Sequence, residues 1–134
     1  MIRVRVKANR VTARRAAPAL REAVARAVEA GAEDLREAAR EMISEPRAAG
    51  PSEPGTPPRS ETGRLRDSLF VRTSADGLSA EVGTDLDYGA HLEFGTQTMP
   101  ARPWLHPAFE ATRKRIKERI RAAARDAMAK GRRP

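Results

Sequence analysis

The sequence predicts an α+β fold, in which a small antiparallel sheet packs on a long helix and a C-terminal helix. Residues 2–7 alternate between apolar and basic side chains, which is the period of a strand. Residues 68–83 carry the pattern of a β-hairpin, and the segments 18–44 and 106–129 repeat apolar residues at helical spacing. One sheet face covered by two helices is a common arrangement for a small domain.

The strands are predicted from alternation and from one turn signal. The apolar residues of 2–7 would form the buried face of the N-terminal strand. Asp76-Gly77 favours a two-residue hairpin turn, because both residue types tolerate a positive φ angle. We therefore expect the N-terminal strand to join hairpin strands at 68–75 and 78–83.

The helices are predicted from apolar stripes. Pro18 suits the first turn of the first helix, since its missing N–H would be unpaired there in any case. Gly31 falls mid-helix, where glycine costs about 1 kcal/mol relative to alanine, and marks either a bend or a close helix contact. A short helix is expected at 88–94, and Gly131 ends the last helix. The first stripe comprises Leu20, Val24, Val28, Leu35, Ala39 and Met42, and the second Leu105, Phe109, Ile116, Ile120, Ala123 and Ala127.

Length and proline content predict the domain organisation. The 134 residues suit a single domain over 1–134, which ends in a basic C-terminal tail. Residues 45–62 contain five prolines and two glycines, and we expect a long mobile loop there. Aromatic residues make up only 4% of the chain, so large core anchors are few. Partner subunits are therefore expected to supply part of the stability.

The net charge of +8 is concentrated at the two ends of the chain. Residues 1–15 hold six bases and no acid, residues 113–134 hold ten bases and two acids, and the middle is acidic. This pattern suits contact with nucleic acid, attraction between subunits, or a soluble protein with a basic tail, and composition leaves all three open. The candidate contact with DNA or an acidic partner is a row of cations four residues apart on the last helix, Arg113, Lys117, Arg121 and Arg125.

Several classes of function are not expected. The chain has no cysteine, so it forms neither a disulfide scaffold nor a cysteine nucleophile, and no apolar run is long enough to cross a membrane. His91-Leu92-Glu93 has the H-x-E pattern of zinc deaminases but lacks their cysteine pair. A metal site built from His91 and His106 is a minor alternative. We expect no enzyme activity, no cofactor, no membrane contact and no small-molecule substrate.

Two segments resemble a known family. Residues 62–69 (TGRLRDSL) follow the proline-rich stretch, and residues 82–108 contain Tyr88, then EFGT at 93–96, then PARPWL at 100–105. This combination is similar to the gene-product-ten family of neck and tail-completion proteins of long-tailed phages. The tail-completion protein Z of phage lambda is a distant relative of that family. The resemblance covers about residues 18–120.

The resemblance implies a structural protein of the virion, made in the host cytoplasm, rather than an enzyme. Family members assemble as rings around the DNA channel at the head–tail junction, and their fold is α+β. The implied partners are further copies of the chain, neighbouring neck, tail-terminator or tail-tube proteins, and packaged DNA in a non-specific contact. The alternative function is a small basic DNA-binding module, which would bind DNA with a steep salt dependence.

The motif residues suit packing and turn roles. Tyr88 and Leu92 would share a face of a short helix, and Gly95 would take the positive φ angle that ends it. The candidate subunit-interface or motif residues are Tyr88, Leu92, Glu93, Phe94, Gly95, Thr96, Pro100, Arg102, Pro103, Trp104 and Leu105.

The second half of the motif leads into the last helix. Trp104 and Leu105 are apolar anchors, and the motif residues as a group, Tyr88 and Phe94 included, either build the monomer core or contact a neighbouring subunit. Glu93 and Arg102 are candidates for an ion pair within or between subunits. The sequence does not choose between these alternatives.

Overall fold

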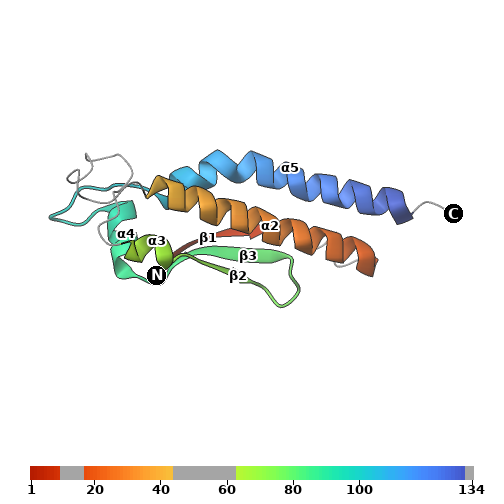
Figure 1. Ribbon diagram of the computed structural model, residues 1–134, viewed down its shortest axis with the longest axis horizontal. Helices are drawn as coiled ribbons and strands as arrows, with labels where there is room; N and C mark the ends of the chain where they lie inside the picture. The colour runs from red at the N-terminus through yellow and green to blue at the C-terminus, as the bar shows by residue number, and fades with distance from the viewer. Residues whose placement is uncertain (10–16, 44–62, 132–134) are drawn as a thin grey trace.

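The computed structural model describes residues 1–9, 17–43 and 63–131. It confirms the α+β fold, with a three-stranded antiparallel sheet packed against a long helix and a C-terminal helix (Figure 1). The loop expected at 45–62 and the end of the basic tail lie outside the described residues. In chain order the elements are β1 (Ile2–Lys7), α2 (Pro18–Met42), α3 (Arg64–Asp67), β2 (Phe70–Thr73), β3 (Ser79–Thr84), α4 (Asp87–Phe94) and α5 (Leu105–Gly131).

The strand order is β1-β3-β2, so β1 and β2 are the edges of the sheet. The register pairs Val6 with Ala80 and Val4 with Val82, which aligns the apolar residues of two strands on one face. Helix α2 packs against this face, and α5 runs along α2 and also reaches β1 (Figure 1). The N-terminal strand was predicted with the observed bounds, because its alternation of apolar and basic residues is complete.

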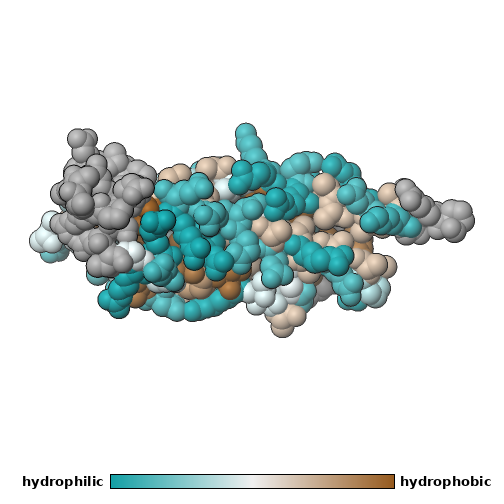
Figure 2. Space-filling model, in the orientation of Figure 1, coloured by the Kyte–Doolittle hydropathy of each residue, from teal (hydrophilic) through white to brown (hydrophobic). Residues whose placement is uncertain are grey.

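The two long helices pack closely. Gly31 is buried in α2, and a Cβ atom added there would lie 2.8 Å from Cγ2 of Ile116 in α5. The mid-helix glycine therefore marks a close helix contact. An ion pair of 2.8 Å between Asp34 and Arg119 joins the same helices at the surface. Figure 2 shows hydrophilic side chains over much of the visible surface of this helix pair, as expected when the apolar stripes turn inward.

The hairpin differs from the predicted one. Residues 74–78 connect β2 to β3, and of these only Gly77 has a positive φ angle, 72°. The carboxylate of Asp76 accepts hydrogen bonds from the Ser74 hydroxyl (2.6 Å) and the Leu78 N–H (3.0 Å). The expected two-residue turn was wrong because this side-chain bonding builds a longer loop in which Asp76 keeps a negative φ angle.

Helix α3 has no counterpart in the sequence prediction. Gly63 precedes it with a φ angle of 75°, and the Ser68 N–H closes it by bonding to the Arg64 carbonyl at 3.0 Å. Residues 68 and 69, expected in the first hairpin strand, therefore precede β2. Four residues are too few for a helical period to be visible in the sequence.

Candidate functional site

Helix α4 carries the first half of the motif. Its buried residues are Gly89, Leu92 and Glu93, which have the i, i+3, i+4 spacing of one helix face. A Cβ atom at Gly89 would lie 2.4 Å from Cγ2 of Thr84 and 3.2 Å from the ring of Trp104. Glycine at this position therefore lets α4 sit directly on the indole.

Tyr88 and Leu92 both lie in α4 at the i, i+4 spacing of one helix face, but their exposure differs. Leu92 is buried, but Tyr88 lies at the margin of the buried face and its residue is 43% exposed. Phe94 is 74% exposed, because it lies on the opposite side of α4 from Gly89. These two aromatic residues are not core anchors of the monomer.

Glu93 ties the two halves of the motif together. Its residue is only 7% exposed, and its Oε1 accepts hydrogen bonds from the backbone N–H groups of Leu105 (2.6 Å) and Trp104 (3.1 Å). The His106 N–H lies 3.4 Å from both carboxylate oxygens. Glu93 thus caps the start of α5, where backbone N–H groups have no partner within the helix and a negative charge is favoured.

Sequence reasoning missed this role of Glu93 and offered Arg102 as its partner instead. The signal that could have revealed it is the lack of a Ser, Thr, Asp or Asn side chain directly before α5, where Pro103 and Trp104 stand. Such a helix start needs an acceptor from elsewhere in the chain. The Arg102 backbone N–H donates to the Leu92 carbonyl at 2.6 Å, which holds the same segment against α4.

The turn between the helices is closed locally. Gly95 has a φ angle of 76°, as predicted, and donates its N–H to the His91 carbonyl at 2.8 Å. The Thr96 hydroxyl accepts the Met99 N–H at 3.1 Å. Pro100 is exposed, and Pro103 is half-buried. These contacts return the chain from α4 to the first turn of α5.

Trp104 and Leu105 are core anchors, as one of the two alternatives proposed. Trp104 is 0% exposed, and its Nε1–H donates to the Gly89 carbonyl at 2.9 Å. Leu105 is also buried. The indole therefore both fills the core and satisfies a buried polar group of α4.

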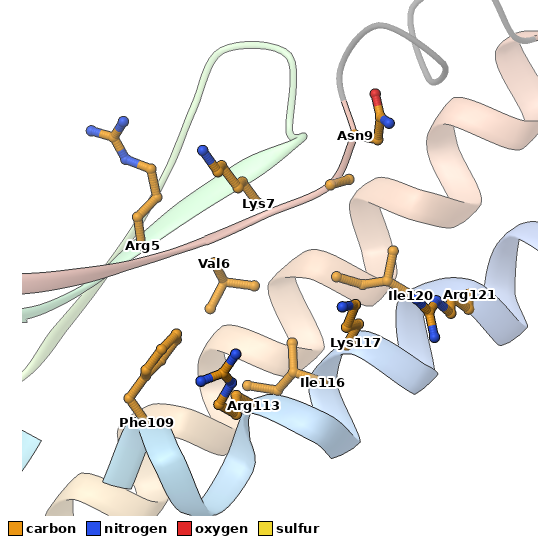
Figure 3. A pocket seen from close by; sticks show the side chains of 11 residues that line it. Arg5, Val6, Lys7, Asn9, Phe109, Arg113, Ile116, Lys117, Ile120 and Arg121 are labelled. Carbon is orange, nitrogen blue, oxygen red and sulfur yellow. The ribbon is translucent and has the colours of Figure 1, made fainter. Parts of the chain in front are cut away.

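A groove lies between β1 and α5, with a volume of about 650 Å³ (Figure 3). The predicted cationic row contributes three of its four members to the groove, and Arg125 is not among the lining residues. The sequence did not predict that β1 lies beside α5, because nothing in either segment shows that residues about a hundred positions apart share a surface. The charged lining residues are Arg5, Lys7, Arg113, Lys117 and Arg121.

The cations of the row have different surroundings. Arg113 forms an ion pair with Glu110 (3.4 Å), and Arg125 with Glu118 (3.0 Å). Within the described part of the chain, Lys117 forms no ion pair and neither does Arg121. Among the described residues, two members of the row, Lys117 and Arg121, therefore bring unpaired positive charge to the groove.

The neighbouring sheet surface contains a charged cluster. Glu81 on β3 lies 2.8 Å from Arg5 and 3.4 Å from Arg3. The hydrogen bond from Arg5 holds the pKa of Glu81 below its usual value, and the charges of Arg3 and Arg72 act in the same direction. Arg5 therefore has an internal partner in addition to its place at the groove.

Metal binding and membrane crossing find no support in the described residues. His91 and His106 are exposed, and no three His, Asp or Glu side chains among residues 1–9, 17–43 and 63–131 are grouped to hold a metal ion. The helices seen in these ranges lack the combination of length and hydropathy that a membrane span needs.

Fold and site together define a small α+β protein whose distinctive surface features are two exposed aromatic residues at α4 and a cationic groove beside β1. The chain belongs to the HK97-gp10-like family of phage tail components. The family model described as "Bacteriophage HK97-gp10, putative tail-component" matches residues 4–95. No curated protein and no solved structure gives a significant match.

The family match confirms the resemblance seen in the sequence and makes the chain a structural phage protein of the virion. The matched range runs from β1 to Gly95 and so includes α4. The segment 100–105 and α5 lie beyond it. The contacts of Glu93 connect the matched part to this remainder.

Proposed function

We propose that this tail component is a neck or tail-completion protein, which forms a homo-oligomeric ring around the DNA channel at the head–tail junction. Membership of the tail-component family supports the structural role. The observation that carries the proposal further is Phe94, a large aromatic residue that is 74% exposed within the family-like motif. Exposed aromatic residues are enriched at the centres of protein interfaces.

In this proposal the motif has two functions. The buried residues Leu92, Glu93 and Trp104 hold α4 rigidly on the start of α5. The exposed Tyr88 and Phe94 then contact a neighbouring copy. A contact of this kind between two different surfaces of identical subunits is heterologous, and it closes into a ring when the rotation between subunits allows. Neck, tail-terminator or tail-tube proteins would lie above and below the ring.

The test is deletion of the gene in the phage or prophage that encodes it, followed by negative-stain microscopy of the lysate. We expect filled heads and full-length tails that remain unjoined, or tails with defective upper ends. Normal infectious particles from the deletion strain would contradict the proposal.

Complementation then tests the interface. Expression of Phe94→Ser should fail to restore joined particles, because serine removes the exposed apolar anchor without touching the core. Met128→Ser is the matched control, since Met128 is 46% exposed and lies near the far end of α5. Restoration by both variants would show that Phe94 is not part of a subunit contact.

A further inference from the structure

Within the described residues, the edge of β1 that faces away from β3 has backbone groups without hydrogen-bond partners. The Ala8 N–H donates to the Leu78 carbonyl, and the antiparallel register continues from that pair through Val6 and Val4. Hydrogen-bonded pairs alternate along an antiparallel ladder. Arg5 and Lys7 therefore direct their backbone N–H and C=O groups away from β3, toward the open edge.

The open edge borders the groove beside α5. Val6 points from β1 toward the helix, and Phe109 and Ile116 point back toward the strand (Figure 3). Phe109 and Ile120 are only partly buried, although both pack against the core. The floor of the groove is thus apolar and incompletely covered.

Cations lie on α5 beside this floor and on the opposite face of β1 (Figure 3). Arg5 and Lys7 point to the side of β1 that faces away from α5, while Arg113, Lys117 and Arg121 lie along the helix (Figure 3). Among the described residues that line the groove, none is Asp or Glu. Lys7, Lys117 and Arg121 have no ion-pair partner within the part of the chain that the structure describes.

We propose that this groove binds an extended polypeptide segment of another protein, in which acidic and apolar residues alternate, as a fourth strand beside β1. Side chains of such a strand alternate between two faces. The apolar set would cover Phe109 and Ile120 above α5, and the acidic set would face Arg5 and Lys7. Lys117 and Arg121, at the α5 side of the groove, would add to its attraction for the acidic segment as a whole. Main-chain bonds to a sheet edge supply affinity in this mode of recognition, and alternate side chains supply specificity.

The dimensions limit the length of the bound segment. The groove follows the chain from Arg5 in β1 to Asn9, two residues beyond the end of the strand, which is about 13 Å at the rise of an extended chain. Along α5 it extends from Phe109 to Arg121, which is about 18 Å at the helical rise. About four to six extended residues therefore fill it.

DNA fits the same surface less well. A phosphate group only accepts hydrogen bonds, whereas the edge of β1 offers outward carbonyl groups as well as N–H groups. The apolar floor would gain nothing from phosphate contacts. The peptide proposal uses the cations, the edge and the floor together. It does not depend on a ring at the head–tail junction, so each proposal can fail without the other.

A binding titration of the full chain tests the groove. The probe is the fluorescein-labelled peptide Glu-Val-Asp-Ile-Glu-Val-Asp, followed by fluorescence anisotropy at increasing NaCl concentrations. We expect saturable binding that weakens with salt. The triple variant Lys7→Gln, Lys117→Gln, Arg121→Gln should bind at least tenfold more weakly.

Two controls separate the groove from general attraction between charges. The triple variant Lys114→Gln, Arg115→Gln, Lys130→Gln removes the same charge from exposed α5 residues outside the groove and should keep the affinity within about twofold. A peptide of the same sequence with N-methylated alternate amides should bind at least tenfold more weakly, because it cannot pair with an edge.

Three results would overturn the proposal. The first is equal affinity of the two triple variants for the peptide. The second is equal binding of the methylated and unmodified peptides, which would leave only charge attraction. The third is competition by a DNA duplex: if the duplex displaces the peptide, and if only the groove triple variant binds the duplex more weakly, the surface is a nucleic-acid site.

Discussion

The buried carboxylate of Glu93 gives the sharpest test of how the motif works. Glu93→Ala removes the acceptor of two short bonds, from the N–H groups of Leu105 (2.6 Å) and Trp104 (3.1 Å). Both residues are at most 1% exposed, so water cannot replace the lost acceptor. A bond to a charged acceptor contributes roughly 1.5–3 kcal/mol, and loss of a helix cap costs roughly 0.5–2 kcal/mol.

We therefore expect Glu93→Ala to lower the free energy of unfolding by about 2–4 kcal/mol. Glu93→Gln keeps one oxygen acceptor and should cost about half as much. The assay is urea unfolding followed by circular dichroism, with hydrogen exchange of the Trp104 and Leu105 amides as a local readout. In the alanine variant these amides should exchange faster even under native conditions.

The matched control is Glu110→Ala, which removes an exposed carboxylate from the first turns of the same helix and should change stability by less than about 0.5 kcal/mol. The cap interpretation would be refuted if Glu93→Ala were no more destabilising than this control, or if the exchange of both amides were unchanged.

Three other predictions concern the sheet, the helix pair and the indole. Because the folded-state pKa of Glu81 is lowered, the ionised carboxylate adds to the free energy of unfolding above the unfolded-state pKa, and this stabilisation is lost as pH falls through the folded-state pKa. In the Glu81→Gln variant, the free energy of unfolding from urea titrations should therefore fall less between neutral pH and about pH 3. Gly31→Leu should cost about 1–3 kcal/mol or more by overpacking against Ile116, measured by chemical unfolding. Trp104→Phe should cost about 1–3 kcal/mol, since the Gly89 carbonyl loses its donor, and Trp104→Ala about 3–5 kcal/mol, both measured by thermal unfolding.

The fold class could be predicted because its signals are local. Alternation in residues 2–7 and the stripes of the two helices depend only on spacing, and the structure confirms these elements. The hairpin was found, but its turn was wrong, since the Asp76 side chain bonds to its own loop instead of allowing a positive φ angle. Helix α3 was missed because one turn leaves no periodic trace.

The site was predictable in composition but not in geometry. The motif residues were identified from the resemblance, yet the sequence left open whether its aromatic residues point inward. The structure divides them, with Trp104 in the core and Phe94 at the surface. Glu93 was missed as a helix cap because the lack of a capping side chain before α5 indicates that an acceptor is needed, but not which distant residue supplies it. The groove was missed because β1 and α5 meet only in the folded chain.

The central claim is that this tail component forms a ring between head and tail. It is tested most directly by a cryo-EM reconstruction of the neck of intact particles from the phage or prophage that encodes it. The account predicts a closed ring of copies of this chain around the DNA channel, with the Phe94 side chain buried against the next subunit. A neck without this chain, or a ring in which Phe94 faces solvent, would contradict it.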